Sequence, residues 1–371
     1  MRIRFSGRAL TLTLLLALIA MPVLAQQRQQ QQQLPPKEFT DITVLPYTPI
    51  KNQASTSTCW CFSAISFLES ELQRMGKPAY DLSEIWVVHH VYRDKAETYV
   101  RMHGNNNFGP GGLGHDVFAA IAEHGIVREQ DYPGTWPYEE QHNHAELHSV
   151  LTGMLDAVIR ARPGPSPKWM KGYTAALAAY LGPLPATITV NGRSLSPKQF
   201  ADEVLEIEPE KYVEITSFSH MPWYETVDLL VPDNWVRNDD TWNLPAADAM
   251  EILRHAIEGG YTVVFGGDVS ERTFDQRMGY AVWREGEEIA DTDRQATWDA
   301  WSTTDDHGMH VVGIASDEEG NVFYRVKNSW GDTGPYGGHI YMSENFIKAK
   351  FDLLTVHIDA VPDDIRIRMK R

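Results

Sequence analysis

The sequence predicts an α+β protein of two lobes with a cleft between them. Helical spacing of apolar residues dominates the front of the chain, whereas short β-type runs separated by Gly, Asn and Asp turns dominate the part after residue 260. The 371 residues, of which 43% are hydrophobic and 22% charged, suit a globular protein of one large or two modest domains.

Helices are expected mainly in the front of the chain, where capping signals accompany the apolar periodicity. The first begins near Cys59, with Ser57 or Thr58 as its capping residue, and stops at Gly76. A Gly-rich turn over 108–116 leads into a later one. The further expected helices are residues 83–102, 116–124, 145–162, 168–181, 197–205 and 246–258.

Strands are expected mainly in the back of the chain. Residues 213–235 are aromatic and β-rich, and the stretch Asp317 to Asn321 has the composition of a hairpin turn. The expected strands beyond this region are residues 261–265, 311–315, 322–327, 339–342 and 353–358.

Charge and cysteine content exclude several classes of function. The chain has 33 Lys and Arg against 50 Asp and Glu, which gives a formal charge of −17. Such acidity argues against a nucleic-acid partner, because the phosphate backbone requires a basic face. Cys59 and Cys61 are the only two cysteines, which rules out a disulfide framework and a four-cysteine zinc site.

Residues 1–25 have the pattern of a Sec-type signal peptide. Three arginines precede an apolar run that ends in small residues suited to cleavage after Ala25. Removing them changes the charge to −20, and we expect an exported protein, periplasmic or secreted, with no stable membrane insertion. A retained N-terminal anchor is the alternative. Residues 26–38 then form a Gln-rich disordered tether before the folded domain, residues 39–371.

Cys59 is the first candidate for chemistry. A helix N-terminus stabilises a thiolate, which is the reactive form of cysteine, although a lone cysteine in a helix is more often a small buried hydrophobic residue. Cys61 lies about 200° around the helix from Cys59 and is expected to be a buried core thiol. His307 and His310 have His-x-x-His spacing, but positions three apart along a strand face opposite ways and no third ligand is evident, so no metal site is expected.

Cys59 and three other parts of the sequence together resemble the pattern of the papain-like cysteine peptidases. Gln53 precedes the Cys59-Trp60 pair by six residues, His307 opens an apolar strand, and Asn328-Ser329-Trp330-Gly331 follows. The resemblance implies a helical lobe that carries the Cys helix and a β-sheet or barrel lobe that carries His and Asn. The spacing from His307 to Gly313, the glycine expected to end its strand, also matches that family.

Within that family the resemblance is to the bleomycin hydrolase and aminopeptidase C branch. It covers roughly residues 45–135 and 245–358. It rests on the segments 52–62, Leu82-Ser83, Gly111-Gly112 with Asp116, His307-Gly308-Met309, 326–331 and Tyr341-Met342-Ser343.

The resemblance implies a role for each matched residue in peptide hydrolysis. Cys59 would attack the peptide carbonyl, His307 would carry its proton to the leaving amine, and Asn328 would orient the imidazole. The Gln53 side chain and the Cys59 backbone N–H would stabilise the oxyanion. Trp330 would shield the His–Asn hydrogen bond from water.

Gly111 and Gly112 would line the wall where an extended substrate backbone pairs, because glycine allows close approach of another chain. Each motif also has a plainer explanation as a turn. Nothing in the sequence requires a cofactor or a metal. The expected partners are peptide substrates, and the oligomeric state stays open, since the resemblance allows a homo-oligomer.

Two departures from the family pattern affect the expected function. His307 follows Cys59 by 248 residues, whereas roughly 130–150 are typical, so an insertion of about 100 residues is expected, approximately within 136–245. The branch often blocks part of its cleft with a C-terminal tail, which selects substrates with a free amino terminus. Residues 360–371 are a candidate for such a tail here, so aminopeptidase activity is expected to depend on them.

Two other functions fit the same residues. A papain-like cleft could bind peptides without cleaving them, and the same nucleophile could serve an amide deconjugase or an acyl transferase. His142, His144 and His148 form a loose group that is expected to lie in a solvated loop.

Overall fold

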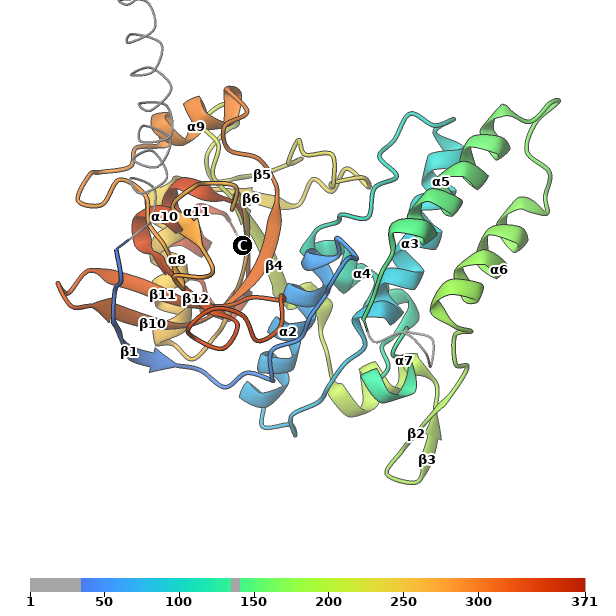
Figure 1. Ribbon diagram of the computed structural model, residues 1–371, viewed down its shortest axis with the longest axis horizontal. Helices are drawn as coiled ribbons and strands as arrows, with labels where there is room; N and C mark the ends of the chain where they lie inside the picture. The colour runs from blue at the N-terminus through green and yellow to red at the C-terminus, as the bar shows by residue number, and fades with distance from the viewer. Residues whose placement is uncertain (1–34, 135–140, 371) are drawn as a thin grey trace, which may run out of the picture. The chain divides into compact units, whose positions relative to one another are not determined.

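The computed structural model describes residues 35–134 and 141–370 (Figure 1). The expected signal peptide, residues 1–25, and most of the expected tether lie outside the described residues. The folded unit runs from Glu38 to Arg371. In the described part of the chain, no helix combines the length and the apolar character that crossing a membrane requires.

The front of the folded unit is helical, as the sequence predicts. Helix α2 (Cys59–Arg74) lies between a sheet and a group of helices, so its buried residues contact both (Figure 1). That group consists of α3 (Glu84–Arg101), α4 (Gly114–His124), α5 (Ala145–Arg160), α6 (Trp169–Leu181), α7 (Pro197–Gln199) and a π-helical turn (Phe200–Leu205). A small hairpin, β2 (Ile188–Val190) with β3 (Arg193–Leu195), connects α6 to α7.

The back of the unit forms one large sheet among the described residues. Its strands run in the order β5-β6-β4-β13-β7-β10-β11-β12-β9-β8, and β1 (Phe39–Val44) pairs with β10. The first five strands of that order are β5 (Glu225–Val227), β6 (Thr241–Asn243), β4 (Tyr212–Thr216), β13 (Phe351–His357) and β7 (Val263–Gly267). The others are β10 (His307–Asp317), β11 (Val322–Lys327), β12 (His339–Ser343), β9 (Tyr280–Ala281) and β8 (Phe274–Asp275).

Four helices accompany the sheet. Helix α8 (Ala246–Glu258) contacts β7 and β10 and has the bounds that the sequence predicts. Helices α9 (Asp291–Asp299), α10 (Glu344–Lys350) and α11 (Asp363–Arg368) are not predicted by the sequence analysis. Each is nine residues or shorter, which is too short for a helical repeat of apolar residues to be recognised in the sequence.

The core consists of two large hydrophobic clusters. One gathers the apolar faces of α2, α3 and α4, and the other gathers α8 and the sheet. The α2 helix faces β10 and β7 with its other side, so the residues at its N-terminus meet the first residues of β10. This contact positions the site.

Two expectations about the elements need correction. The β-rich stretch over 213–235 contains only β4 and β5 as strands, and residues 228–240 are irregular because side-chain bonds from Asn234 hold them in turns. Gly313 does not end its strand, since β10 continues to Asp317. A Cβ at Gly313 would lie 2.3 Å from the Thr43 carbonyl oxygen, so glycine there permits the approach of β1.

The segment expected as an insertion divides between the two lobes. Its described first part packs against α3 through α5 and α6, whereas β4, β5 and β6 extend the sheet beside β13. Between β5 and β6 the irregular segment 228–240 reaches back toward the helical lobe, where Asn106 donates to the Trp235 carbonyl at 3.1 Å.

Candidate active site

Cys59 is the first residue of α2, as predicted. Thr58 is the N-cap residue, but its side chain bonds to the Thr56 hydroxyl at 2.7 Å and not to the helix, which corrects the expected capping by Ser57 or Thr58. The N-terminus of α2 therefore has no side-chain cap, and Cys59 stands at the positive end of the helix dipole.

Gly308 brings the start of β10 against this helix end. A Cβ at Gly308 would lie 2.7 Å from Ser63 Oγ and 3.2 Å from the Cys59 carbonyl oxygen. The backbone N–H of Gly308 donates a hydrogen bond to the Cys59 sulfur. Glycine is thus required for close packing, and His307, the preceding residue, lines the same cavity as Cys59.

His307 and Asn328 are joined as the sequence pattern anticipates. The imidazole Nε2 lies 2.8 Å from Asn328 Oδ1, and both residues are buried. The Trp330 ring stacks on the His307 ring with centroids 4.7 Å apart and an interplanar angle of 30°. Trp330 covers one face of the imidazole, which limits the access of water to the hydrogen bond.

Gln53 is held at the same site by Ser329. The Gln53 backbone N–H donates to the Ser329 carbonyl at 2.8 Å, and the Ser329 hydroxyl donates to Gln53 Oε1 at 2.5 Å. This bond to the side-chain oxygen fixes the orientation of the Gln53 amide. Its NH2 group is then available to donate hydrogen bonds.

Gly111 and Gly112 line the opposite wall. The Trp60 indole donates to the Pro110 carbonyl at 3.0 Å, and the buried Lys95 ammonium donates to the carbonyls of Gly109 and Gly111. A Cβ at Gly112 would lie 3.0 Å from the Trp60 ring. The loop is therefore tied down from behind, with glycine at the points of closest approach.

One cavity of about 490 Å³ is lined by Cys59, Gln53, His307, Gly111 and Gly112, whereas Asn328 and Trp330 stand behind His307 and do not line it. Cys59 and Gln53 come from the helical side, and His307 from the sheet side. Three carboxylates also line the cavity: Asp233, Asp305 and Asp306. No lysine or arginine is among the described residues that line it.

Burial favours the neutral forms of the thiol and the imidazole. It raises the pKa of Cys59 to about 11, with the Gly308 N–H acting against the rise and Asp305 adding to it. Burial also lowers the pKa of His307 to about 4, while the hydrogen bond to Asn328 acts in the opposite direction. A thiolate–imidazolium pair at this site therefore depends on the attraction between its two members and on the α2 N-terminus.

The structure adds Gln276 as a positioning residue that the sequence analysis did not find. Asn328 Nδ2 donates to Gln276 Oε1 at 3.1 Å, and Gln276 lies in the turn between β8 and β9. Its own amide donates to the His339 carbonyl at 3.3 Å. No local pattern marks Gln276, since it stands 52 residues from its partner.

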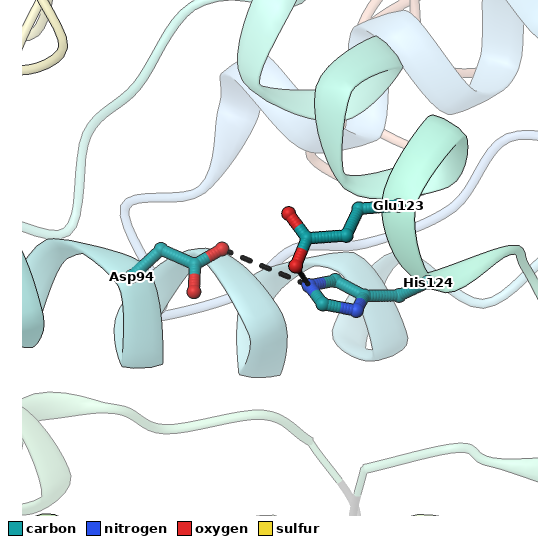
Figure 2. Close-up of side chains that lie close together, drawn as sticks. All are labelled: Asp94, Glu123 and His124. Atoms are coloured by element: carbon teal, nitrogen blue, oxygen red, sulfur yellow. Dashed lines mark ion pairs between the residues drawn. The ribbon is translucent and has the colours of Figure 1, made fainter.

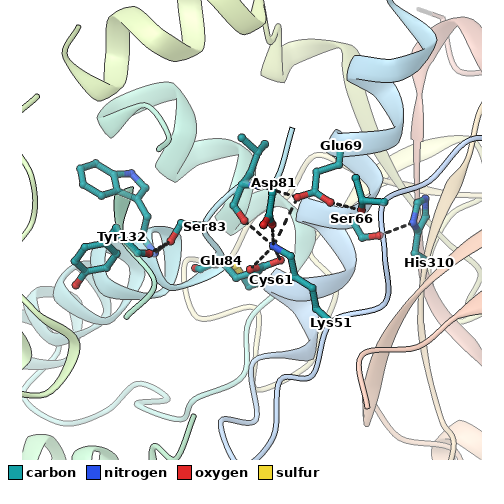
Figure 3. A network of polar contacts seen from close by, with 12 residues as sticks. Lys51, Cys61, Ser66, Glu69, Asp81, Ser83, Glu84, Tyr132 and His310 are labelled. Atoms are coloured by element: carbon teal, nitrogen blue, oxygen red, sulfur yellow. Dashed lines mark hydrogen bonds and ion pairs between the residues drawn. The ribbon is translucent and has the colours of Figure 1, made fainter. Parts of the chain in front are cut away.

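Cys61 is a buried thiol on the far side of α2, which confirms the prediction for it. It donates to the Glu84 carbonyl at 3.3 Å and borders an ion network in which Lys51 lies 2.7 Å from Asp81 and 2.9 Å from Glu84 (Figure 3). His310 Nδ1 lies 2.9 Å from Ser66 Oγ, beside the same network.

A group of possible metal ligands lies away from the cavity. Asp94 and Glu123 approach Nε2 of His124 at 3.8 and 3.7 Å (Figure 2). Both carboxylates face the same ring nitrogen of His124. The expected absence of a metal stays a prediction.

The expectation that the group of His142, His144 and His148 lies in a solvated loop is wrong for two of its members. His144 is the buried N-cap residue of α5, and burial lowers its pKa to about 4. The His148 ring stacks on Phe108 with centroids 5.9 Å apart. The stretch from Asp317 to Asn321 is a hairpin turn, as predicted, with the Asn321 N–H donating to Asp317 Oδ1.

Comparison with known proteins places this arrangement in a family. Residues 37–196 match the sequence profile of the papain family cysteine proteases, and residues 190–371 match that of the peptidase C1-like family. The two matches together span the whole folded unit.

Individual relatives show the same similarity. Aminopeptidase G of Lactobacillus delbrueckii subsp. lactis is 22% identical over 85% of this chain and 82% of its own length. Cysteine proteinase 2 of Entamoeba histolytica is 37% identical, but the match spans 31% of this chain and 40% of that protein. The crystal structure of pepw from Lactobacillus rhamnosis shares the fold, with a TM-score of 0.73 and 17% identity over 93% of this chain and 86% of that one.

The chain belongs to the papain-like cysteine peptidases, and its two-lobed α+β fold is the fold of that family. The match of residues 190–371 to the peptidase C1-like family and the similarity to Aminopeptidase G over most of both chains put it in the aminopeptidase C and bleomycin hydrolase branch. Both conclusions agree with the resemblance that the sequence motifs indicate.

Proposed function

We propose that this protein is an exported cysteine peptidase that hydrolyses peptide bonds through Cys59, His307 and Asn328. The observation that carries the proposal is the meeting of two lobes at one cavity. Cys59 at the N-terminus of α2 and His307, held by Asn328 at 2.8 Å, line the same 490 Å³ space although 248 residues separate them.

The first half of the reaction forms an acyl-enzyme. The Cys59 proton passes to His307, and the sulfur bonds to the carbonyl carbon of the substrate. Negative charge then develops on the carbonyl oxygen, where the Gln53 amide and the Cys59 backbone N–H donate hydrogen bonds. His307 gives its proton to the leaving amine as the C–N bond breaks, which leaves a thioester on Cys59.

The second half of the reaction repeats these roles with water. His307 accepts a proton from water as its oxygen bonds to the thioester carbon. The C–S bond breaks, the acid product leaves, and Cys59 recovers its proton. Asn328 stabilises the imidazolium in both halves, because its Oδ1 accepts from the ring nitrogen that faces away from the substrate.

Aminopeptidase activity and export are part of the same proposal. The similarity to Aminopeptidase G and to Aminopeptidase C of Lactobacillus delbrueckii subsp. lactis, over 85% of this chain in each case, supports removal of amino-terminal residues. The basic and apolar composition of residues 1–25 supports export.

Labelling with a thiol-directed epoxide peptide tests the nucleophile. We expect one label at Cys59, located by mass spectrometry of the digested protein, and Cys59-dependent cleavage of a peptide library. Cys59→Ala should abolish both, while Cys61→Ala serves as the matched control and should keep both. Labelling only at Cys61 would overturn the assignment.

A further inference from the structure

The segment between β5 and β6 places a carboxylate at the active-site cavity. Asn107 Nδ2 donates to Asp233 Oδ1 at 3.0 Å and to the Pro232 carbonyl at 3.0 Å. Within the segment, Asn234 Nδ2 donates to Asp228 Oδ1 and to the Leu229 carbonyl, each at 3.0 Å. Asp233 is thus held against the helical lobe by a built set of bonds.

Asp233 lies directly over Gly111. A Cβ at Gly111 would come within 1.8 Å of Asp233 Oδ2, so the carboxylate occupies the space that any other side chain at Gly111 would need. If Gly111 and Gly112 line the wall where substrate backbone pairs, an extended peptide that runs along this wall meets Asp233. The segment therefore closes one end of the cleft with a negative charge.

Further carboxylates lie on the sheet side of the same cavity. Asp305 is two residues before His307 and interacts electrostatically with Asp233 across the cavity. Behind it, Asp352 is 1% exposed and shares a side-chain hydrogen bond with Asp305, so one of these two carboxyl groups carries a proton and burial raises the pKa of both. Asp352 Oδ1 lies 3.0 Å from where a Cβ at Gly266, a cavity residue, would stand.

The cations near these carboxylates donate their hydrogen bonds to backbone carbonyls, although by electrostatic attraction Lys95 also opposes the rise that burial causes in the pKa of Asp233, and Arg294 the rise in that of Asp352. The Lys95 ammonium donates to the carbonyls of Gly109 and Gly111 behind the loop, and the Arg294 guanidinium donates to the carbonyls of Ser217, Lys348 and Phe351. Neither lines the cavity. Carboxylates that are partly withdrawn from water and face one space favour a cationic ligand there.

Residues 360–370, the part of the tail that the structure describes, do not provide this closure. In the part of the tail that the structure describes, Ile365 and Met369 are buried in the cluster around α8, and Arg368 donates to Asp248 and to the Tyr224 hydroxyl at 2.7 Å each. None of its described residues lines the cavity. The dependence of aminopeptidase activity on the tail stays a prediction, and the position of the described part of the tail does not support it.

We propose that Asp233, with Asp305 opposite it, binds the α-ammonium group of the substrate, so that the segment 228–240 selects peptides with a free amino terminus. This inference rests on the proposed peptidase function and deepens it. The same carboxylates could hold the ammonium or guanidinium of a Lys or Arg side chain, and the experiment separates the two sources.

Binding to the inactive Cys59→Ala protein tests the inference without cleavage. Calorimetric titration compares a short apolar peptide with a free amino terminus, the same peptide acetylated, and an acetylated peptide that contains Arg. We expect the free peptide to bind about 10- to 100-fold more tightly than its acetylated form, as a charge-assisted contact requires. Adding Asp233→Asn should remove most of that difference, whereas Asp239→Asn, an exposed residue of the same segment, should keep it.

Two results would overturn the inference. One is an equal affinity for free and acetylated peptides in the Cys59→Ala protein. The other is a loss on Asp233→Asn that affects only the Arg-containing peptide. Steady-state kinetics on proteins that keep Cys59 test the peptidase function separately. If these proteins do not cleave peptides but still prefer a free amino terminus in binding, only the proposed function is contradicted. With turnover, Asp233→Asn should raise kcat/KM for acetylated substrates relative to free ones.

Discussion

Replacing Asn328 with alanine tests how the site works. The substitution removes the acceptor 2.8 Å from His307 Nε2 and leaves the imidazolium that forms during the reaction without its partner. A hydrogen bond to a charged group is worth about 1.5–3 kcal/mol, which corresponds to roughly a 10- to 150-fold loss of kcat/KM. Because Asn328 does not line the cavity, the loss is expected in kcat, with KM little changed.

The assay is steady-state cleavage of a fluorogenic peptide over a range of pH. The bond to Asn328 raises the pKa of His307, so its removal makes the imidazolium lose its proton at lower pH. The alkaline limb of the kcat/KM profile should therefore move to lower pH in Asn328→Ala. The rate of Cys59 labelling by an epoxide should fall with kcat/KM.

Gln276→Ala is the control variant, and it should lower kcat/KM less than Asn328→Ala does. It removes a bond between neutral groups that only orients Asn328, so the loss should be about 2- to 10-fold. A fall of less than about threefold in Asn328→Ala, a change confined to KM, or a larger effect from Gln276→Ala would refute the argument. Equal thermal stability of the variants and the parent excludes unfolding as the cause.

Two further predictions concern stability. Lys51→Met leaves the buried carboxylates of Glu69 and Glu84 without their cation, so the free energy of unfolding at pH 7 should fall by roughly 3–5 kcal/mol in urea titrations. The loss should be smaller at pH 5, because burial raises the pKa of Glu84 and Lys51 opposes that rise; a loss equal at both pH values would contradict this. Burial by itself lowers the pKa of His115, but Glu214 and Asp116 outweigh it and raise the pKa to about 9. The charged His115 therefore stabilises the fold fully below about pH 6.5, and up to roughly 3 kcal/mol should be lost as pH rises through 9. The difference in unfolding free energy between the parent and His115→Gln should shrink over that range, and a constant difference would show that His115 does not titrate this way.

The sequence predicts those parts of the fold whose signals are local. Helix α8 matches its predicted bounds because a regular apolar face spans all of its 13 residues between Pro245 and Gly259. The sequence does not predict helix α10, although Ser343 caps it by accepting from the Phe346 N–H, because seven residues are too few to show helical periodicity. The aromatic residues of 213–235 predict strands throughout that stretch, but after β5 the contacts with Asn106 and Asn107 override the preference.

The residues of the candidate site also fall into those that local motifs reveal and those that depend on contacts between distant segments. Cys59, His307 and Asn328 stand in short motifs whose spacing is set by one helix start and one pair of adjacent strands, so a single sequence can reveal them. Asp233 depends on Asn107, 126 residues away, and its meaning depends on Gly111, whose Cβ position it fills.

A contact between distant segments has no periodicity and no fixed spacing. The proposed nucleophile and base can therefore be predicted from the sequence, whereas the proposed substrate-selecting group cannot. That selecting group lies in the inserted part of the chain, where peptidases that share one catalytic arrangement can differ. The free-terminus preference should accordingly follow residues 228–240 and not the catalytic motifs.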